Sequence, residues 1–512
     1  MLALIACPHP SWSINVSRND QIYIDTIKNL IDTRSIGFAA FFSDKKLTSI
    51  RIGAHVMDFK GTDNRAFKGC DRLSDVGFEE TDTPLKLNDW AFQSCFRLTK
   101  GTIDFSTRPI VLGTQAFLSC TYLTQVKFGS KDASIGKQTF QYCTNLTDVI
   151  FSEGVYSIQD QAFDNCGLQT ADLSKCTRLE KVTGFSNCSK LSEVIFPSGN
   201  NVTEIGSDAF YRCVSLAYIV IPDSVTLIGD RAFQGCIQLT EVTLPSSLSR
   251  IGTSLFQDCT SLKRVTLKGN ITTIGDSAFY NCTALTTIRS KETDPENTVT
   301  LPYTLTSIGV SAFENCISLT SIHLPNSLLT IQDRAFFSAG LTSVTLPPSL
   351  TYLGGNCFAS CKNLVKAVLN GKNFTLMTGT FKDCPKLEAI LINGNDNGQY
   401  QDSCFDNLPS LRFVLLPDDF DYSIDTSIFS KCSGLIKGVV LIGNIDTTKG
   451  MGKWSYLKDS TTQVRYAYGK EDGKTYGEGM YLWEWNAQNE TINLYLYTSN
   501  TMTLTETILI PE

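Results

Sequence analysis

A phenylalanine recurs along most of this chain at intervals of 22 to 26 residues, and this repeat limits the possible folds more than any other feature. A single interval, at 34 residues, is longer. The positions are Phe41, Phe67, Phe92, Phe117, Phe140, Phe163, Phe185, Phe210, Phe233, Phe256, Phe279, Phe313, Phe336, Phe358, Phe381, Phe405 and Phe429. A fixed period of this length indicates a solenoid, in which each repeat is one coil that packs against its neighbours.

The repeat unit is close to L-x-x-I-x-L-P-x-S-L-x-x-I-G-x-x-A-F-x-x-C-x-x. Its L-x-x-I-x-L segment predicts one short strand per coil, with the Ile and the second Leu on one face because side chains alternate along a strand. The Pro ends the strand, since it has no N–H to donate to a ladder. The A-F-x-x-C segment supplies apolar side chains from the opposite wall. Such a coil buries its apolar side only when it is stacked, so we expect a parallel sheet along one face.

These patterns divide the chain into three parts. We expect about 17 coils of 22 to 26 residues over residues 30–440, which form a leucine-rich repeat solenoid. Residues 1–29 are expected to be an N-terminal cap or a processed segment, with a short amphipathic helix at 20–30 covering the first coil. Residues 441–512 are expected to form a small, β-rich, aromatic C-terminal cap or module.

The 18 cysteines belong to the repeat, because 14 of them stand three places after one of its phenylalanines. No C-x-x-C pair occurs, which argues against zinc ribbons and redox motifs. We expect a ladder of buried, reduced thiols on one wall of the solenoid. The repeat departs from its pattern between Phe163 and Phe185, where two half-formed strands and an extra Cys176 share one interval. The longest interval holds a polar insert at 289–297, expected to be a solvated loop.

The segment Ile-Gly-x-x-Ala-Phe-x-x-Cys-x-x-Leu resembles the BspA-like class of leucine-rich repeats, and the resemblance covers roughly residues 30–440. Members of that class look like surface or secreted proteins of host-associated anaerobic bacteria and parasitic protists. The resemblance implies a binding or adhesion protein at the cell surface or outside the cell. A cytoplasmic location is the alternative, because the chain shows no complete signal peptide.

Composition excludes several other functions. Lys and Arg number 44 against 51 Asp and Glu, for a net charge of −7, so a nucleic-acid partner is not expected. There are three histidines and no recognisable catalytic, nucleotide-binding or metal-binding motif, so we expect neither an enzyme nor a cofactor. The sequence contains no run of 18 apolar residues, so we expect no transmembrane segment. Leu4 to Cys7 match a lipoprotein cleavage pattern, but the six preceding residues are too few for a complete signal, which argues against a lipid anchor at Cys7.

The C-terminal part is rich in aromatic residues that alternate with polar ones. Trp483 and Trp485 lie in one such run and a second run follows at 491–497, which together predict a β-hairpin. We interpret this unit as a cap on the solenoid. The two tryptophans could instead contact a sugar or a protein.

Three functions fit this sequence. We favour a non-catalytic binding or adhesion protein that presents an extended surface to a protein or a glycan. An intracellular repeat scaffold is the first alternative. The second is an enzyme whose activity lies in the C-terminal unit, with the repeats as a targeting arm. Neither the ligand nor the oligomeric state follows from the sequence.

The outward side chains of the strands locate the expected contact surface. They stand five and seven places after the repeat cysteine, where they alternate with the buried Ile and Leu. The candidate ligand face consists of Glu241, Arg264, Arg289 and His323. Towards the C-terminus the outward positions form an apolar stripe of Val368, Leu391, Phe413, Leu415 and Val439. A soluble monomer rarely leaves such a stripe bare, so we expect the C-terminal unit to cover it.

Overall fold

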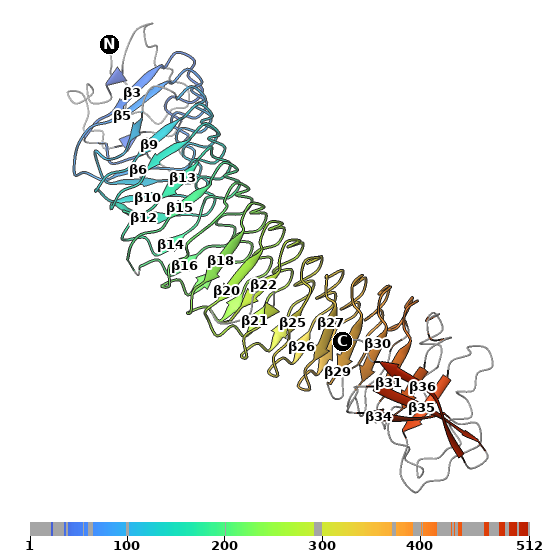
Figure 1. Ribbon diagram of the computed structural model, residues 1–512. Helices are drawn as coiled ribbons and strands as arrows, with labels where there is room; N and C mark the ends of the chain where they lie inside the picture. Colours follow the sequence, from blue (N-terminus) through green and yellow to red (C-terminus); the bar gives the residue numbers. More distant parts are fainter. Residues whose placement is uncertain are drawn as a thin grey trace. The chain divides into compact units, whose positions relative to one another are not determined.

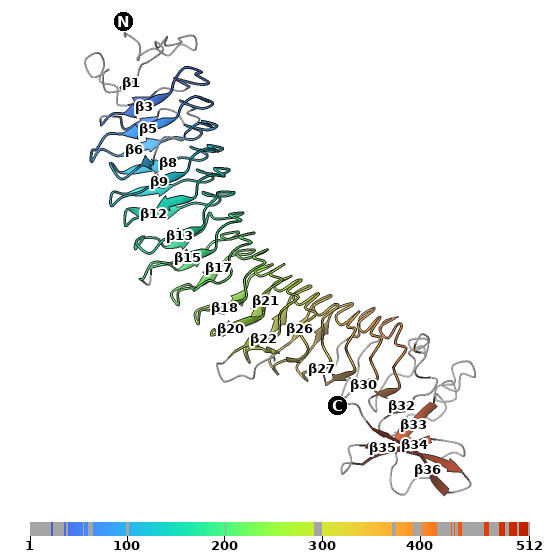
Figure 2. The same cartoon turned by 45° about the horizontal axis from the view of Figure 1, so that its top comes forward.

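The computed structural model describes residues 39–416 apart from gaps at 55, 60–64, 99–101, 200, 291–298, 371–374, 393–400 and 402. It also describes residues 22–23, 35–36, 432, 435, 439–442, 465–469, 481–486, 491–498 and 501–509. The chain divides into two compact units. Unit 1 comprises Met1–Leu248 and Leu255–Leu262, and unit 2 comprises Ser249–Ser254 and Lys263–Glu512. The described residues form a β-solenoid of about 15 turns without an α-helix (Figures 1 and 2), as the repeat predicts.

The first sheet of unit 1 is built from the strand that follows each repeat cysteine. Its strands are β1 (Ile22–Tyr23), β3 (Ser49–Ile52), β5 (Asp75–Phe78), β7 (Ile103–Asp104), β9 (Gln125–Lys127), β11 (Asp148–Ile150), β13 (Thr170–Asp172), β15 (Glu193–Ile195) and β18 (Glu241–Leu244). All of these strands except β18 form parallel ladders with one another, in the orders β1-β3-β5, β7-β9-β11 and β13-β15. Side chains alternate between a buried and an outward position, as in β18, because successive residues of a strand point to opposite faces.

Most of the described coils also contribute a second short strand, which the repeat pattern did not predict. In unit 1 these strands are β2 (Ser35–Ile36), β4 (Asp58–Phe59), β6 (Leu85–Leu87), β8 (Ile110–Leu112), β10 (Ala133–Ile135), β12 (Val155–Ile158), β14 (Lys181–Val182), β16 (Glu204–Ile205) and β17 (Leu227–Ile228). They form a second pair of parallel ladders, β2-β4-β6-β8-β10-β12 and β14-β16-β17. The second strand ends at the apolar residue before the turn. Its backbone pairs from coil to coil because the coils stack in register.

Unit 2 repeats this plan. Its first-sheet strands are β20 (Arg264–Leu267), β22 (Thr287–Arg289), β23 (Val299–Thr300), β25 (Ile322–His323), β27 (Ser343–Leu346), β29 (Lys366–Leu369), β30 (Ala389–Ile392), β31 (Phe413–Leu416) and β32 (Val439–Ile442). The second sheet contains β19 (Arg250–Ile251), β21 (Thr273–Ile274), β24 (Ser307–Ile308), β26 (Thr330–Ile331) and β28 (Tyr352–Leu353). Four further strands continue the first sheet beyond β32: β33 (Arg465–Gly469), β34 (Tyr481–Asn486), β35 (Thr491–Thr498) and β36 (Thr501–Leu509). β34 and β35 pair antiparallel, as the alternating aromatic runs predict.

A column of phenylalanine rings forms the centre of each unit. In unit 1 the rings of Phe67 and Phe92 stack with centroids 4.9 Å apart and planes within 6°. In unit 2 Phe313 and Phe336 stack at 5.3 Å and 2°. The rings are buried and in parallel contact because every coil places its phenylalanine at the same point of the turn. The repeated phenylalanine thus supplies the continuous core that a single coil lacks.

The repeat cysteines are buried thiols, which confirms the expected ladder for the 14 cysteines that stand three places after a phenylalanine. The structure also describes Cys176, Cys357 and Cys404 as buried and free. Most of the repeat thiols also donate a hydrogen bond, which their burial alone did not reveal. The Sγ of Cys120 donates to the carbonyl of Phe92 in the preceding coil at 3.2 Å, and Cys236 makes the same bond to Phe210 at 3.3 Å. The cysteine therefore connects successive coils by a weak hydrogen bond as well as filling space.

The turns around the phenylalanines require left-handed backbone at fixed positions. The residue just before the cysteine has a positive φ, as in Ser94 and Ser119, both at 60°. Glycine occupies this position at Gly69 and Gly235, with φ of 76° and 74°. Ser, Asn, Asp or Gly at this site therefore reflects the backbone geometry of the turn.

The second sheet of unit 1 is interrupted between β12 and β14, which end separate ladders. In the next coil five residues lead from Ile205 to Phe210, whereas Val182 and Phe185 are three apart. Phe185 stays in the ring column, 5.5 Å from Phe163. We attribute the interruption to this shortened turn. Because Phe185 stays in the column, the short connection holds β14 close to the column and out of register with β12.

Two local expectations were wrong. Ile22–Tyr23 form strand β1, which pairs parallel with β3, so the helix expected at 20–30 is not present at these residues. An added strand pairs with the open edge of the first ladder, which a helix does not do. The polar insert begins later than expected, because Arg289 belongs to β22, and the chain returns as the extra strand β23. Residues 291–298 and the rest of the first 29 residues lie outside the described part of the chain.

Candidate partner-binding surface

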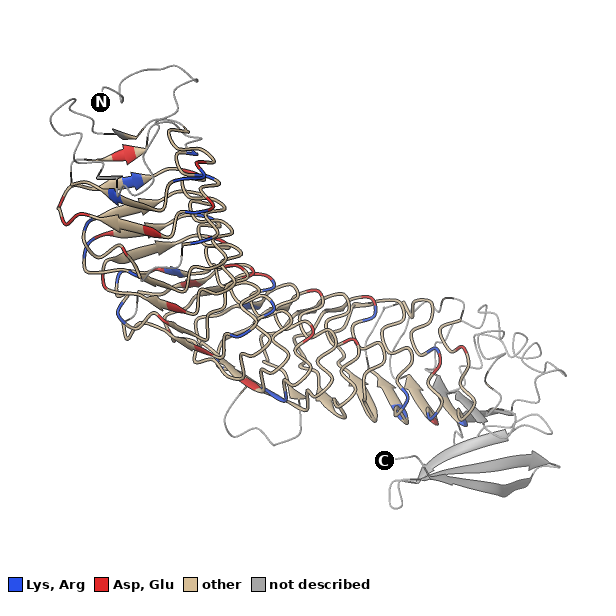
Figure 3. Ribbon diagram, turned by 90° about the horizontal axis from the view of Figure 1, so that it is seen from above, with Lys and Arg blue, Asp and Glu red and all other residues tan. Residues whose placement is uncertain are grey.

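The outward side chains of the first sheet in unit 1 form a patch of acidic and apolar residues. It consists of Asp148, Asp172, Glu193, Ile195, Tyr218 and Val220, and we call it the acidic-apolar patch. Asp172 pairs with Ile195 across β13 and β15. Tyr218 and Val220 follow in the next coil, where they alternate with the buried Ile219 and Ile221. Figure 3 marks acidic residues on the strands of this sheet.

The apolar members of the patch are unusually open to solvent. Val220 is 74% exposed, Tyr218 51% and Ile195 38%. Tyr218 Oη donates to Glu193 Oε1 at 3.3 Å, which connects the aromatic ring to the acidic side of the patch. An exposed apolar cluster with a polar rim is typical of a protein interaction site.

The acidic members have polar contacts but no ion pair within the described residues. Asp172 accepts the backbone N–H of Ser174 at 3.0 Å, and Asp148 accepts from the side chain of Gln125. Glu193 accepts from the hydroxyls of Thr170 and Tyr218. The three carboxylates therefore leave a negative charge that no neighbouring base neutralises. Such a surface attracts a basic partner.

The sequence contained the signal for this patch, although the candidate ligand face did not include it. Positions five and seven after Cys188 are Glu193 and Ile195, and after Cys213 they are Tyr218 and Val220. The counting rule that selected the candidate ligand face therefore applies here without change. The exposure of Val220, which distinguishes an open patch from a covered one, was not readable from the sequence.

The structure divides the candidate ligand face between the two units. Glu241 lies on β18 of unit 1 and is exposed. Arg264 and Arg289 lie on the adjoining strands β20 and β22 of unit 2, where Arg289 pairs with Thr266. His323 is exposed on β25 and pairs with Thr300 of the extra strand β23. Unit 2 thus brings Arg264 and Arg289 together and places one strand between Arg289 and His323.

The apolar stripe of unit 2 is two rows of side chains. Val368 pairs with Leu391 and Leu391 with Leu415, whereas Phe413 pairs with Val439 in the adjoining row. Val368 and Leu391 are half-buried, and Phe413 is 3% exposed. The side chains of Leu415 and Val439, and those of Trp483 and Trp485 on β34, lie outside the described part. That the C-terminal unit covers the stripe stays a prediction.

Deleting residues 445–512 tests this cover. If the C-terminal unit shields the stripe, the shortened protein exposes Val368 and Leu391 more fully. We expect stronger binding of a hydrophobic dye and self-association in sedimentation analysis, relative to the full chain. A shortened protein that stays monomeric and binds no more dye would show that the tail does not cover the stripe.

The described residues offer little for chemistry. They contain no group of three or more His, Cys, Asp or Glu side chains arranged to hold a metal ion. Burial raises the pKa of Cys236 to about 12, so this thiol is protonated at neutral pH and is a poor nucleophile. No helix in the described part is both long and apolar enough to cross a membrane.

Comparison with known proteins gives one family. The chain matches the model of the BspA type leucine rich repeat region over residues 34–169, 110–226, 177–297 and 291–412. Its fold is similar to that of a leucine-rich repeat protein from Bacteroides ovatus, with 22% identity, a TM-score of 0.50 and coverage of 72% of this chain and 86% of that chain. No curated protein matches the chain.

Two other solved structures show weaker similarity. A leucine-rich repeat protein from T. pallidum is 30% identical over 37% of this chain and 75% of that chain, with a TM-score of 0.27. A leucine rich cell surface protein from Faecalibacterium prausnitzii is 19% identical over 82% of this chain and 84% of that chain, with a TM-score of 0.30.

Proposed function

Because this chain belongs to the BspA-type leucine-rich repeat family, we propose that it is a non-catalytic binding or adhesion protein of the cell surface or the extracellular space. The observation that carries the proposal is the acidic-apolar patch, with Val220 74% exposed beside carboxylates that have no ion pair in the described part. The first sheet holds these side chains at fixed spacings of about 5 Å from strand to strand. A rigid, preformed surface loses little conformational entropy on binding.

The chemistry of the patch favours a basic protein as partner. Its apolar centre suits an aliphatic or aromatic side chain of the partner, and its three carboxylates suit surrounding Lys or Arg residues. A neutral glycan has no cationic group to neutralise these carboxylates. Arg264, Arg289 and His323 of unit 2 stay our proposal for a second contact region. Glu241, which belongs to unit 1, stays a separate proposed contact.

Charge reversal within the patch tests the proposal. We expect the double variant Asp172→Lys and Glu193→Lys to lose at least tenfold in affinity, about 1.4 kcal/mol, for the protein that binds wild type from a panel of purified extracellular-matrix and cell-surface proteins. Biolayer interferometry measures the affinity, and rising salt should weaken wild-type binding because exposed charges are screened.

The controls separate the two regions of the surface. Asp75→Lys changes an outward acid of β5, away from the patch, and should leave the affinity unchanged. Arg264→Glu combined with Arg289→Glu tests unit 2. If only the unit 2 variant loses affinity, the binding surface lies there, and if neither variant loses affinity, the sheet face is not the contact surface.

An intracellular scaffold is the second candidate function, and the buried thiols favour it. The 17 described cysteines form no disulfide, which suits a reducing or oxygen-poor compartment. Labelling intact source cells with a membrane-impermeant biotin reagent distinguishes the two candidates. Labelled protein supports the surface location, and protein labelled only after lysis supports the scaffold.

A further inference from the structure

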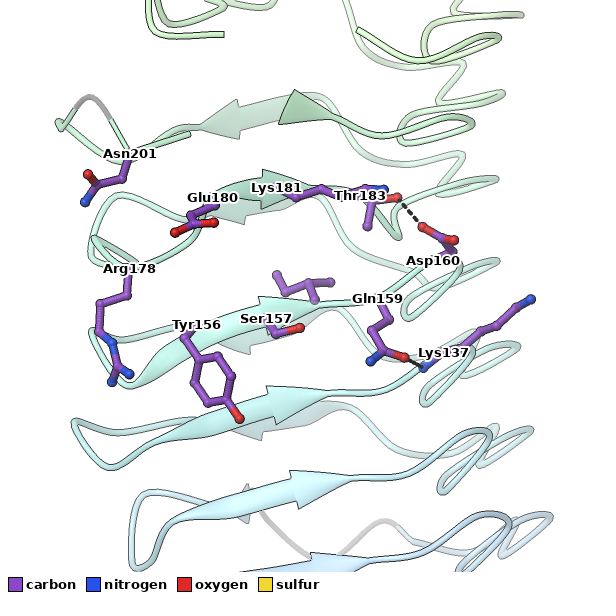
Figure 4. A pocket seen from close by; sticks show the side chains of 11 residues that line it. Lys137, Tyr156, Ser157, Gln159, Asp160, Arg178, Glu180, Lys181, Thr183 and Asn201 are labelled. Atoms are coloured by element: carbon purple, nitrogen blue, oxygen red, sulfur yellow. Dashed lines mark hydrogen bonds between the residues drawn. The ribbon is translucent and has the colours of Figure 1, made fainter. Parts of the chain in front are cut away.

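A pocket of about 770 Å³ opens in unit 1 where the second sheet is interrupted between β12 and β14 (Figure 4). Its volume lies within the range of about 300–1,000 Å³ that is usual for small-molecule sites. Tyr156, Ser157 and Ile158 of β12 line the pocket, together with Lys181 of β14. Arg178 and Asn201 lie towards one end in Figure 4. This site is separate from the acidic-apolar patch, which belongs to the first sheet.

The walls of the pocket contain backbone groups that the interrupted ladder leaves available. In neighbouring coils the N–H of Gln159 donates to the carbonyl of Ile135 at 2.9 Å, and that of Gly206 donates to Val182 at 2.9 Å. The equivalent bond would run from Thr183 N–H to the Ile158 carbonyl, and no such bond is present between these two described residues. Both residues line the pocket. Thr183 is 1% and Ile158 3% exposed, so these backbone groups can be reached only by water or by a ligand atom at the base of the pocket.

The side chains of the pocket alternate between donors and acceptors. Arg178, Lys181 and Lys137 are cationic, while Glu180 and Asp160 are anionic. The carboxylate of Asp160 accepts from the Thr183 hydroxyl at 3.3 Å, which holds it at the edge of the pocket. With both signs interleaved, the pocket does not select a strongly charged ligand. The pocket suits a ligand whose groups both donate and accept hydrogen bonds, as hydroxyl groups do.

An aromatic ring completes the lining. Tyr156 is the extra residue of a bulge in β12, because Ala133 pairs with Val155 and Ser134 with Ser157. The guanidinium of Arg178 lies 5.3 Å from the centre of its ring and also pairs with Asp132. These contacts hold the ring and the guanidinium in place before a ligand arrives. Together they offer one apolar and one hydrogen-bonding surface at the same end of the pocket.

We propose that this pocket binds a short saccharide of one to three sugar units. Sugar hydroxyls match the paired donors and acceptors of the lining, and the apolar face of a sugar ring suits the exposed part of Tyr156. An apolar ligand would leave the polar groups of the walls without partners. A phosphate or a carboxylate would meet Glu180 and Asp160, which disfavours a small anion.

The test compares intact protein with a variant that fills the pocket. Ser157→Trp places a large side chain between β12 and β14. Its matched control is Leu227→Trp, at the same register position on β17, where the ladder with β16 is intact. Glu180→Ala removes an acceptor without filling the pocket. An array of defined mono-, di- and trisaccharides identifies the best probe, and calorimetry then measures its affinity for each variant.

The expected result is saturable binding of one saccharide by wild type and by Leu227→Trp, with at least a tenfold loss in Ser157→Trp and in Glu180→Ala. Circular dichroism checks that the variants are folded, and Glu180→Ala carries the test if Ser157→Trp is not. The proposal is overturned if no saccharide binds saturably or if both pocket variants bind as wild type does. It is also overturned if the dipeptide Gly-Gly or inorganic phosphate binds more tightly than every saccharide.

Discussion

Raising the pH from 8 to 10.5 is expected to lower the free energy of unfolding steeply. Burial raises the pKa of Cys176, Cys188 and Cys236 to about 12. In an unfolded chain thiols ionise near pH 8.5 to 9. Above that pH the unfolded state loses protons that the folded state keeps, so the folded state is disfavoured. Each such thiol costs about 1.4 kcal/mol per pH unit until the pH approaches its folded pKa.

Several thiols together make this a large effect, because net stabilities are usually about 5–15 kcal/mol. Below pH 8 the thiols are protonated in both states and their contribution is constant. Urea denaturation followed by circular dichroism at pH 8, 9, 10 and 10.5, with reductant present, measures the change. In the double variant Cys188→Ala and Cys236→Ala, the free energy of unfolding should fall less between pH 8 and 10.5. The difference from wild type is the contribution of the two missing thiols. A denaturation midpoint that does not move with pH would contradict the buried ladder.

Replacing Arg108 by Met is expected to cost about 3–5 kcal/mol, because it leaves three backbone carbonyls without their donors, at about 1–3 kcal/mol for each buried group. Arg108 is 0% exposed. Its Nη1 donates to the carbonyl of Gly53 at 3.0 Å and its Nη2 to that of Val56 at 2.6 Å. Its Nε and Nη2 also donate to Thr83 at 3.2 and 2.9 Å. Arg108 thus joins two preceding coils, and its loss leaves buried carbonyls without these donors.

A surface arginine is the matched control for this variant. Arg231 makes a bidentate ion pair with Asp208 at 2.8 and 2.9 Å, but its side chain is 54% exposed. Replacing Arg231 by Met should therefore cost about 1 kcal/mol or less. Urea denaturation of both variants at pH 7 gives the comparison. Equal losses for the two arginines would show that the carbonyl bonds of Arg108 do not stabilise the fold.

The solenoid could be predicted because its determinants repeat. The phenylalanine occupies the same position in every coil, so the period of the sequence predicts that Phe117 and Phe140 are in contact. Their rings stack with centroids 5.4 Å apart. The strand after each cysteine follows from alternation, as in β18. The second sheet was missed because most of its strands, such as β17, are two residues long, which is too short for alternation to be detected.

The pocket and the buried Arg108 were harder to predict than the solenoid, because they depend on local departures from the repeat. The interval between Phe163 and Phe185 was visibly irregular, but its consequence depends on three-dimensional register. We attribute the pocket to Val182, which is two residues closer to its phenylalanine than the corresponding Ile205 of the next coil. The buried state of Arg108 depends likewise on carbonyls of two other coils. The acidic-apolar patch was within reach, since Tyr218 and Val220 occupy the counted outward positions.

We propose that the outward face of the first sheet is the partner-binding surface. Hydrogen–deuterium exchange of the intact protein, with and without the partner captured from the protein panel, tests it most directly. We predict slower exchange on binding at β13, β15 and residues 216–222, with no change in the phenylalanine turns of the same coils. Protection confined to those turns or to the C-terminal strands, with the first sheet unchanged, would contradict the claim.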